Sequence, residues 1–238
     1  MANLTQLKIL EDLNGLILVD KPAGIAFSTV IKTVKRKFNL VKVGHGGSLD
    51  TAASGLMVLL LNDANRFVGE VMGADRVYEG SMRLGIATNT HDIHGAIVSE
   101  KPLPADLDGE IAKALLEFKG DVFQTESRWC SVRRDGSHEY EVADTGEHKP
   151  FLAHVYKFDI ERKEAEKFSF SLSATKGLIV RTLINDFGAA IGCGAVLEDL
   201  RRVKVGRWTL DEAVRFDKLL EAEMGELPAF VKPFVKNF

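Results

Sequence analysis

Alternating and continuous apolar stretches predict the strands of this chain. Leu16–Val19 is an aliphatic run that stops at the turn residues Asp20–Gly24, a pattern typical of a buried strand. Along Val77–Leu84 the character of the residues alternates, so Tyr78 and every second residue after it share one face. In Phe168–Ser173 two phenylalanines and a leucine alternate with serines, which predicts another half-buried strand.

The dipeptide Asp135-Gly136 predicts a hairpin. Asp-Gly is a favoured two-residue turn, because both positions need positive φ. It separates Trp129–Arg133 from His138–Val142, and these two stretches are the expected paired strands.

Apolar residues spaced three and four apart predict the helices. Ser28 or Thr29 can cap a helix that runs to about Phe38, with an apolar stripe opposite a basic one. The apolar stripe consists of Val30, Val34 and Phe38, and the basic residues are Lys32, Lys35, Arg36 and Lys37. A second helix is predicted from about Asp108 to Lys119, because Gly120 is a favourable place for a helix to end.

Two further helices are predicted toward the C-terminus. Gly177–Val180 leads into one helix, and Thr209–Glu212 is a capping box that opens the last one. The apolar face of the first consists of Leu183, Ile184, Phe187 and Ile191. Because strands and helices do not alternate regularly, we expect an α+β fold with a mixed, largely antiparallel central sheet flanked by helices and loops.

The composition is that of an ordinary soluble globular protein. The chain has 238 residues, of which 45% are hydrophobic and 27% charged, enough for a sizeable core. The longest apolar run, Gly55–Leu61, is far too short to span a bilayer. Cys130 and Cys193 form no Cys-x-x-Cys pair, which fits a reducing environment. We therefore expect a cytoplasmic protein with no membrane partner.

The net charge of −3 and the sequence pI near 6.1 exclude a basic field over the whole molecule. A nucleic-acid site would therefore have to be a local patch. Two groups of basic residues are candidates for such a patch, although charge runs are usually solvated faces. The first is Lys32, Lys35, Arg36 and Lys37, and the second is Arg201, Arg202, Lys204 and Arg207.

The stretch Gly44–Asp50, GHGGSLD, admits two interpretations. Leu49 stands where a dinucleotide fingerprint needs glycine, and the Gly-Lys-Ser/Thr of a P-loop is missing, so a phosphate cradle is disfavoured. Asp50 can cap a helix that begins near Thr51, with the glycines allowing positive φ before it. Alternatively, the loop presents the Asp50 carboxylate for chemistry.

The tetrapeptide His91–His94 places three possible metal ligands within four residues. Without a His-Glu-x-x-His motif or a second ligand cluster, the sequence does not complete a metal site. Metal catalysis is therefore disfavoured.

Several segments resemble, in order along the chain, the motifs of the TruB family of tRNA pseudouridine synthases. They are Gly15–Gly24; Lys42–Asp50 with Ala53–Val58; Tyr78 with Leu84-Gly85 and Thr88, Thr90, Asp92 and Gly95; Ser173–Gly177 with Val180–Thr182; and Leu200–Arg202. The resemblance is good over residues 14–98 and 173–212 and thin between them. It implies the pseudouridine synthase catalytic fold over residues 1–238 as a single domain.

The resemblance also implies a reaction, the isomerisation of uridine to pseudouridine in RNA without a cofactor or a metal. Asp50 would be the nucleophile, Arg181 would form an ion pair that keeps its carboxylate charged, and Tyr78 would stack on the uracil and assist proton transfer. From the residues alone, the favoured interpretation is that Arg181 is a surface residue at a helix start and that Tyr78 is a core residue.

The implied partner is the T-arm of tRNA, whose T-loop uridine, at tRNA position 55, must be flipped out before reaction. His45 would insert where the base had been. Lys21, Leu200, Arg202 and Lys176 are carried over as further substrate- or RNA-binding positions. The protein is expected to act as a monomer.

The chain departs from the family pattern in a segment of about residues 120–160, which is expected to contact RNA. Gln124–Ser127 lacks two usual prolines, and Asp144 stands where an arginine is usual. We also expect no added C-terminal RNA-binding β-domain. These departures leave two alternatives open: an RNA-binding or tRNA-folding module with impaired catalysis, and a synthase that acts on another RNA.

Overall fold

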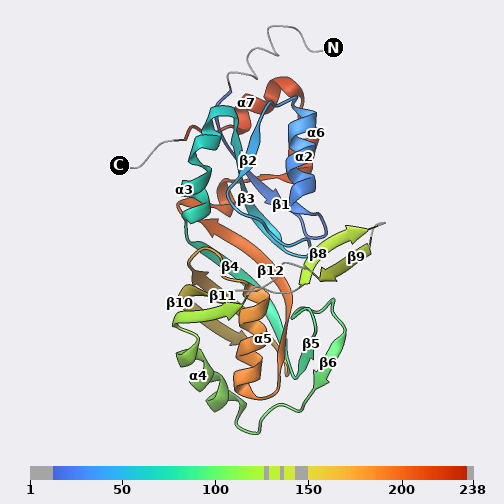
Figure 1. The fold of residues 1–238 in the computed structure, drawn as a ribbon, viewed down its shortest axis with the longest axis vertical. Coiled ribbons are helices and arrows are strands. Elements are labelled where there is room, and N and C mark those ends of the chain that lie inside the picture. The colour runs from blue at the N-terminus through green and yellow to red at the C-terminus, as the bar shows by residue number, and fades with distance from the viewer. Residues whose placement is uncertain (1–12, 126–128, 135–136, 143–149, 235–238) are drawn as a thin grey trace. The chain divides into compact units, whose positions relative to one another are not determined.

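The computed structural model describes residues 13–125, 129–134, 137–142 and 150–234. The chain divides into two compact units (Figure 1). Unit 1 consists of the chain up to Ala74 together with the chain from Arg202 onward, and unit 2 is Asp75–Arg201. Strand β12 (Ala195–Val205) contributes residues to both.

In unit 1 the strands are largely antiparallel. They are β1 (Gly15–Lys21), β2 (Val43–His45), β3 (Ser54–Leu61), β13 (Trp208–Thr209) and β14 (Val214–Arg215), and their order is β14-β1-β3-β12, with β2 added to β3 and β13 to β12. Strand β1 pairs antiparallel with β3 and parallel with β14, which makes the sheet mixed. The predicted aliphatic strand at Leu16–Val19 is therefore confirmed as the centre of β1, and its residues are buried.

Helices cover both faces of the strands of unit 1. They are α2 (Phe27–Lys37), η1 (Asn62–Phe67), α3 (Val68–Gly73), η2 (Leu210–Glu212), α6 (Phe216–Glu221), η3 (Met224–Glu226) and α7 (Leu227–Phe230). Helices α2 and α6 pack on the face formed by Ile17, Val19 and Met57, while α3 packs with Leu18 and Val58 on the other (Figure 1). This opposite placement follows from the alternation of side chains along β1 and β3.

The predicted apolar stripe of α2 is confirmed, because Val30, Val34 and Phe38 are all fully buried. The predicted cap is wrong. The helix begins at Phe27 with Ala26 as its N-cap residue, so Ser28 lies in the first turn, and no side chain caps it.

The capping box at Thr209–Glu212 forms as predicted, but it does not open a long helix. Its two reciprocal hydrogen bonds close a single 3₁₀ turn, η2. The next residues, Val214–Arg215, are drawn into β14 beside β1, and the last helices are the short α6 and α7. Pairing with β1 thus overrides the local helix signal.

Unit 2 is built on antiparallel strands in the order β12-β4-β11-β10-β7. They are β4 (Arg76–Leu84), β7 (Gly120–Thr125), β10 (Pro150–Arg162) and β11 (Lys167–Ala174), with two separate pairs formed by β5 (Ile86–Thr88) with β6 (Ile97–Glu100) and by β8 (Trp129–Arg134) with β9 (Ser137–Val142). The predicted alternation along β4 and β11 is confirmed, since Tyr78 pairs with Leu172 and both are buried. The α+β class with a mixed, largely antiparallel sheet is confirmed.

Helices α4 (Leu107–Glu117) and α5 (Val180–Ile191) complete the core of unit 2. Phe187 of α5 meets the edges of Phe118 and Phe158, with ring centroids 5.7 and 5.3 Å apart. The predicted apolar face of α5 is buried throughout. Asp106 caps α4, one residue earlier than a helix starting at Asp108 requires, and Leu107 and Ala114 are its buried residues.

The predicted hairpin is confirmed as a pair of strands, with Arg133 opposite His138 in the antiparallel ladder of β8 and β9. Its turn, Asp135-Gly136, lies outside the described residues, as do Glu126, Ser127 and Asp144. Among the described residues no helix is long and apolar enough to cross a membrane.

Candidate active site

Asp50 lies in the loop between β2 and β3, and its side chain is exposed. The N–H of Ala53 donates to the carbonyl of Asp50 (3.1 Å), after which the chain enters β3 at Ser54. Because no helix begins near Thr51, the capping interpretation of Asp50 is wrong. The other interpretation, in which the loop presents the Asp50 carboxylate for chemistry, stays a prediction.

The glycines before Asp50 serve packing and backbone conformation. A Cβ on Gly44 would lie 2.1 Å from the side-chain oxygen of Asn65, and one on Gly46 would lie 2.2 Å from Cγ1 of Val71. Gly47 has φ of +124°, which side chains rarely tolerate. The absence of side chains at Gly44 and Gly46 therefore lets the loop backbone pack closely against η1 and α3, and the positive φ of Gly47 lets the chain turn toward Asp50.

Arg202 fastens the part of the loop that precedes Asp50. Its side chain is only 2% exposed, and its guanidinium donates to the carbonyls of Leu56 (2.8 Å), Ser48 (2.8 Å) and Gly47 (3.4 Å). The planar fork of an arginine suits several divergent acceptors at once. One buried cation thus ties the loop to β3.

Gly55 allows Arg202 to approach this closely. It has φ of +106°, and a Cβ there would lie 2.3 Å from the carbonyl oxygen of Arg202. The backbones of β3 and β12 are therefore in contact at this point, which brings the Arg202 guanidinium within reach of the neighbouring carbonyl of Leu56.

Lys21 fastens the part of the loop that follows Asp50. Its ammonium group is fully buried and donates to the carbonyls of Ile25 (2.8 Å), Pro22 (3.0 Å) and Thr51 (3.3 Å). The N–H of Gly24 also donates to the Thr51 carbonyl (2.8 Å). The residue directly after Asp50 is thus anchored twice.

Burial lowers the pKa of Lys21 to about 8, the Asp50 carboxylate opposes this shift, and Arg202 adds to it. Lys21 therefore lies close enough to Asp50 for their charges to interact. A buried ammonium with three donors and three carbonyl partners has used its hydrogen-bonding capacity. The structure thus places Lys21 and Arg202 as supports of the Asp50 loop, and their donors point to backbone carbonyls rather than to solvent.

His45 lies at the start of the same loop and is half-buried. Its ring meets the edge of Phe27, with centroids 5.3 Å apart, and its Nδ1 accepts from the N–H of Gly47 (3.3 Å). Burial lowers its pKa, and the cation of Arg202 acts in the same direction. A neutral, flat imidazole is suited to stacking on a base.

The other predicted site residues belong to unit 2. Tyr78 is 7% exposed on β4, and Arg181, also 7% exposed, is the second residue of α5. Lys176 is exposed in the turn before α5, and Leu200 is buried on β12. The structure thus gathers Asp50, Lys21, His45 and Arg202 in unit 1, with Tyr78, Arg181, Lys176 and Leu200 in unit 2.

The loop at His91–His94 packs on the first turns of α5. Oγ1 of Thr182 lies 3.5 Å from Nδ1 of His91, and burial lowers the pKa of this histidine while the Asp186 carboxylate opposes the shift. Asp92 is engaged within its own loop, where Oδ1 accepts from Thr90 Oγ1 (2.8 Å) and from the N–H of His94 (3.0 Å). The loop's polar groups therefore serve its conformation and its contact with α5.

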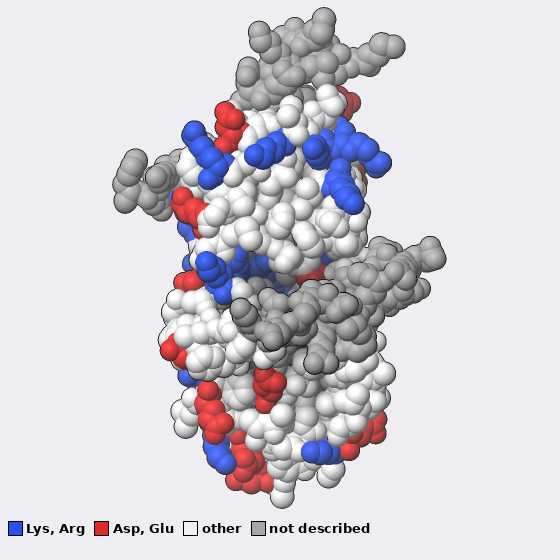
Figure 2. Space-filling view, in the orientation of Figure 1, with Lys and Arg blue, Asp and Glu red and all other residues white. Residues whose placement is uncertain are grey.

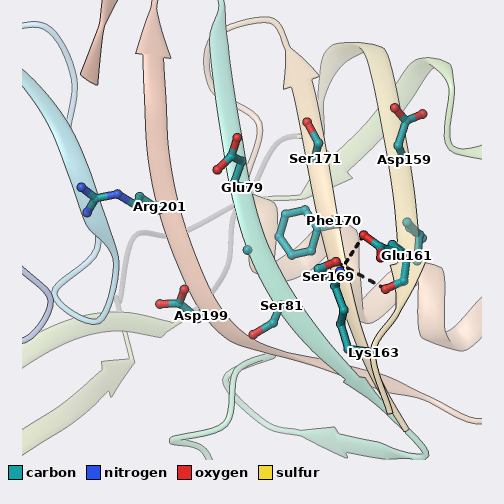
Figure 3. A pocket seen from close by; sticks show the side chains of 12 residues that line it. Glu79, Ser81, Asp159, Glu161, Lys163, Ser169, Phe170, Ser171, Asp199 and Arg201 are labelled. Atoms are coloured by element: carbon teal, nitrogen blue, oxygen red, sulfur yellow. Dashed lines mark hydrogen bonds and ion pairs between the residues drawn. The ribbon is translucent and has the colours of Figure 1, made fainter. Parts of the chain in front are cut away.

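An open hollow of about 550 Å³ lies on the strands of unit 2 (Figure 3). Its charged lining residues are Glu79, Asp159, Glu161, Lys163, Asp199 and Arg201. Four carboxylates outnumber two cations there, and Lys163 pairs with Glu161 at 2.6 Å. This charge balance disfavours a phosphate ligand.

Of the two basic groups predicted from the sequence, the one on α2 forms an exposed basic patch and the one around β12 does not. Lys32, Lys35 and Arg36 are exposed on α2, and Lys and Arg side chains gather over that part of unit 1 (Figure 2). In the second group, Arg202 is buried, and Arg207 stacks over the ring of Trp208 at 5.0 Å. Alternation along β12 turns successive residues to opposite faces, so this group makes no single patch.

Sequence reasoning missed the polar partners of the loop and of α5. Thr51, which is buried, receives the bonds from Lys21 and Gly24, and Gln124 bonds to the backbone of Ile179 at the start of α5. The alternation of side chains along β7 could have placed Gln124 on the inner face, opposite to Phe123 and Thr125. It could not have identified Ile179 as its partner.

Comparisons with known proteins identify the family of this chain. The family described as "TruB family pseudouridylate synthase (N terminal domain)" matches residues 35–180, and "tRNA pseudouridylate synthase B C-terminal domain" matches residues 181–234. A Cbf5–Nop10–Gar1 complex contains a chain of similar fold, with a TM-score of 0.69 and 24% identity, covering 92% of this chain and 60% of that one.

Curated relatives are named tRNA pseudouridine synthase B. The protein from Opitutus terrae is 34% identical over 220 residues, which is 91% of each chain. The protein from Burkholderia pseudomallei is 35% identical over 224 residues, covering 93% of this chain and 74% of that protein. With both family profiles matched in succession and the Asp50 loop built as described, this chain belongs to the TruB family of pseudouridine synthases.

Proposed function

We propose that this protein isomerises uridine to pseudouridine in tRNA, with Asp50 as the nucleophile and the T-loop uridine as the target. Family membership supports the reaction. The observation that carries the choice of Asp50 is the clamped loop, in which Arg202 holds the residues before this carboxylate and Lys21 the residue after it. Such fixed aim is what a catalytic carboxylate needs.

The reaction is an isomerisation with no net oxidation. The N1–C1′ bond of uridine breaks, the freed base turns, and C5 forms a new bond to C1′. The proton on C5 leaves, and N1 gains one. The Asp50 carboxylate adds to the sugar or to the base in the first stage and is expelled later, as a covalent catalyst must be.

Other residues have proposed roles around this step. Arg181 pairs with the Asp50 carboxylate and keeps it charged, and Tyr78 stacks on the uracil and assists the loss of the C5 proton. His45 fills the space that the flipped base leaves, because its half-buried, flat ring can stack on the neighbouring bases.

The test uses tRNA transcripts with tritium at C5 of uridine, because the label is released only when C5 forms the new bond. Asp50→Asn should bind tRNA as the wild type does and lose about 10⁴-fold or more in the rate of release, as expected when a covalent nucleophile is removed. Wild-type turnover by Asp50→Asn would refute the nucleophile, and binding without release by the wild type would indicate an RNA-binding module.

The site of modification and the partner need separate measurements. Mapping pseudouridines in total RNA with and without the protein should find the T-loop position, and modification only elsewhere would indicate another RNA. A transcript of the T-arm alone should be a substrate. We further propose that the protein acts in the cytoplasm as a monomer, so light scattering should give a mass near 26.2 kDa.

A further inference from the structure

The start of helix α5 lacks a cap of its own. Its N-cap residue is Ile179, which has no polar side chain, and the first turn contains no acidic residue. The second helical residue is the buried Arg181. A cation at a helix N-terminus is opposed by the helix dipole, so this turn needs support from elsewhere to hold its geometry.

Gln124 supplies that support through a double hydrogen bond. The N–H of Ile179 donates to Oε1 of Gln124 (2.9 Å), and Nε2 of Gln124 donates to the carbonyl of Ile179 (3.2 Å). That carbonyl also accepts the helical bond from the N–H of Leu183 (3.1 Å). The amide of Gln124 therefore bonds to both backbone groups of one residue, Ile179, at the point where the helix begins.

The pairing is buried and specific to an amide. Gln124 is 3% exposed, whereas its neighbours Phe123 and Thr125 on β7 face outward. Only a side chain with a donor and an acceptor in one plane can satisfy both Ile179 groups. Loss of the Gln124 acceptor deprives the Ile179 N–H of this partner, and loss of the Gln124 donor leaves the Ile179 carbonyl with its helical bond from Leu183 alone.

Strand β7 is also the first part of the segment, about residues 120–160, that is expected to contact RNA. It pairs antiparallel with β10, Gln124 lying opposite Phe151, and it ends at Thr125. The same strand thus connects that segment with the first turn of α5.

We propose that Gln124 is a positioning residue for Arg181, acting through the Ile179 peptide to fix the first turn of α5. This inference rests on the proposed function of Arg181. Displacement of that turn by about 1 Å would lower the rate of isomerisation by roughly 10- to 100-fold, because catalytic groups tolerate little misplacement. Binding of tRNA would change little.

The decisive variant is Gln124→Glu, compared with the wild type from pH 5.5 to 8 under single-turnover conditions with saturating tRNA. An ionised glutamate still accepts from the Ile179 N–H but cannot donate to the carbonyl, so the rate should fall near pH 8. A protonated glutamate offers both groups, and burial raises the pKa of a carboxyl, so the rate relative to wild type should recover as the pH falls. Gln124→Leu should lose the rate at every pH, and Leu116→Gln, at an exposed position of α4 outside the segment expected to contact RNA, should keep it.

A double variant tests whether Gln124 acts through Arg181. If it does, Gln124→Leu should cost much less in an Arg181→Lys background than in the wild type. Full additivity, a loss confined to tRNA affinity, or an equal loss for Gln124→Glu at all pH values would overturn the proposal.

Amide exchange of residues 180–183 separates this proposal from the proposed function. If amide exchange is faster in Gln124→Leu but the Arg181→Lys variant keeps full activity, Gln124 anchors the first turn of α5 and the proposed role of Arg181 is wrong. Unchanged exchange would contradict the anchor, whatever the activity.

Discussion

Replacing Arg202 should loosen the Asp50 loop while leaving the RNA surface intact. The guanidinium makes two short hydrogen bonds, to the carbonyls of Leu56 and Ser48, and one long one to Gly47. Bonds that involve a charged group contribute about 1.5–3 kcal/mol each, so the two short ones contribute roughly 3–6 kcal/mol. The 3.4 Å bond adds little, because it is close to the limit of a hydrogen bond.

Two variants divide this contribution. Arg202→Met removes all three donors and should lower the free energy of unfolding by about 3–5 kcal/mol, because the carbonyls of Leu56 and Ser48 lose a charged donor. Arg202→Lys keeps the charge, but a single nitrogen cannot reach the carbonyls of Leu56 and Ser48 together. It should stay folded and lose roughly 10- to 100-fold in rate, because the carboxylate of Asp50 is no longer held in place.

The measurements are urea unfolding and single-turnover release of tritium from C5-labelled tRNA, at a temperature where all variants are folded. Lys204→Met is the matched control, because it removes an exposed cation from the same strand. A different result would be that Arg202→Lys keeps its rate but binds tRNA more weakly, and that the salt dependence of this binding is smaller by about one phosphate contact. Arg202 would then contact RNA, and its proposed role in holding the Asp50 loop would be wrong.

Three further predictions concern the same unit. Burial lowers the pKa of Lys21 to about 8 from 10.5, so between these pH values the unfolded state binds more protons than the folded state. The free energy of unfolding of the wild type should therefore rise relative to that of Lys21→Met from pH 8 to 10.5 in urea titrations. A constant difference between the two proteins would contradict the burial of the Lys21 ammonium group. Gly46→Ala should destabilise the protein by about 1–3 kcal/mol, because its Cβ would collide with Val71; an unchanged urea midpoint would show that the loop has room. Changing Lys35 and Arg36 to Gln should weaken tRNA binding and reduce its salt slope, as filter binding at several salt concentrations can measure; an unchanged slope would remove α2 from the RNA surface.

Periodicity predicted the elements of this protein well where burial controls them. The stripe of Val30 and Val34 on α2 and the alternation of Phe168 and Phe170 on β11 are buried as expected. These patterns are reliable because each element buries one face and the spacing of apolar residues records which one. Boundaries were predicted less well, since Ala26 rather than Ser28 precedes α2.

Local signals were misleading where another strand competes for the same residues. The capping box at Thr209 forms, yet pairing of Val214 with Val19 of β1 ends the turn that it closes. Asp50 has the character of a helix cap, yet the chain after it enters β3. In both places the hydrogen bonds of a sheet override a propensity that acts over a few residues.

By itself, the sequence determined the class of fold, the apolar faces and, through the order of its motifs, the family and Asp50 as the candidate nucleophile. The tertiary structure alone decided what Lys21, Arg202 and Gln124 do. Arg202 is 154 residues from Ser48, and Gln124 is 55 residues from Ile179. A basic or amide side chain in a strand looks the same in sequence whether it faces water or a buried carbonyl. Which of these it meets depends on elements that only folding brings beside it, because a buried polar group must find its partner wherever the chain packs.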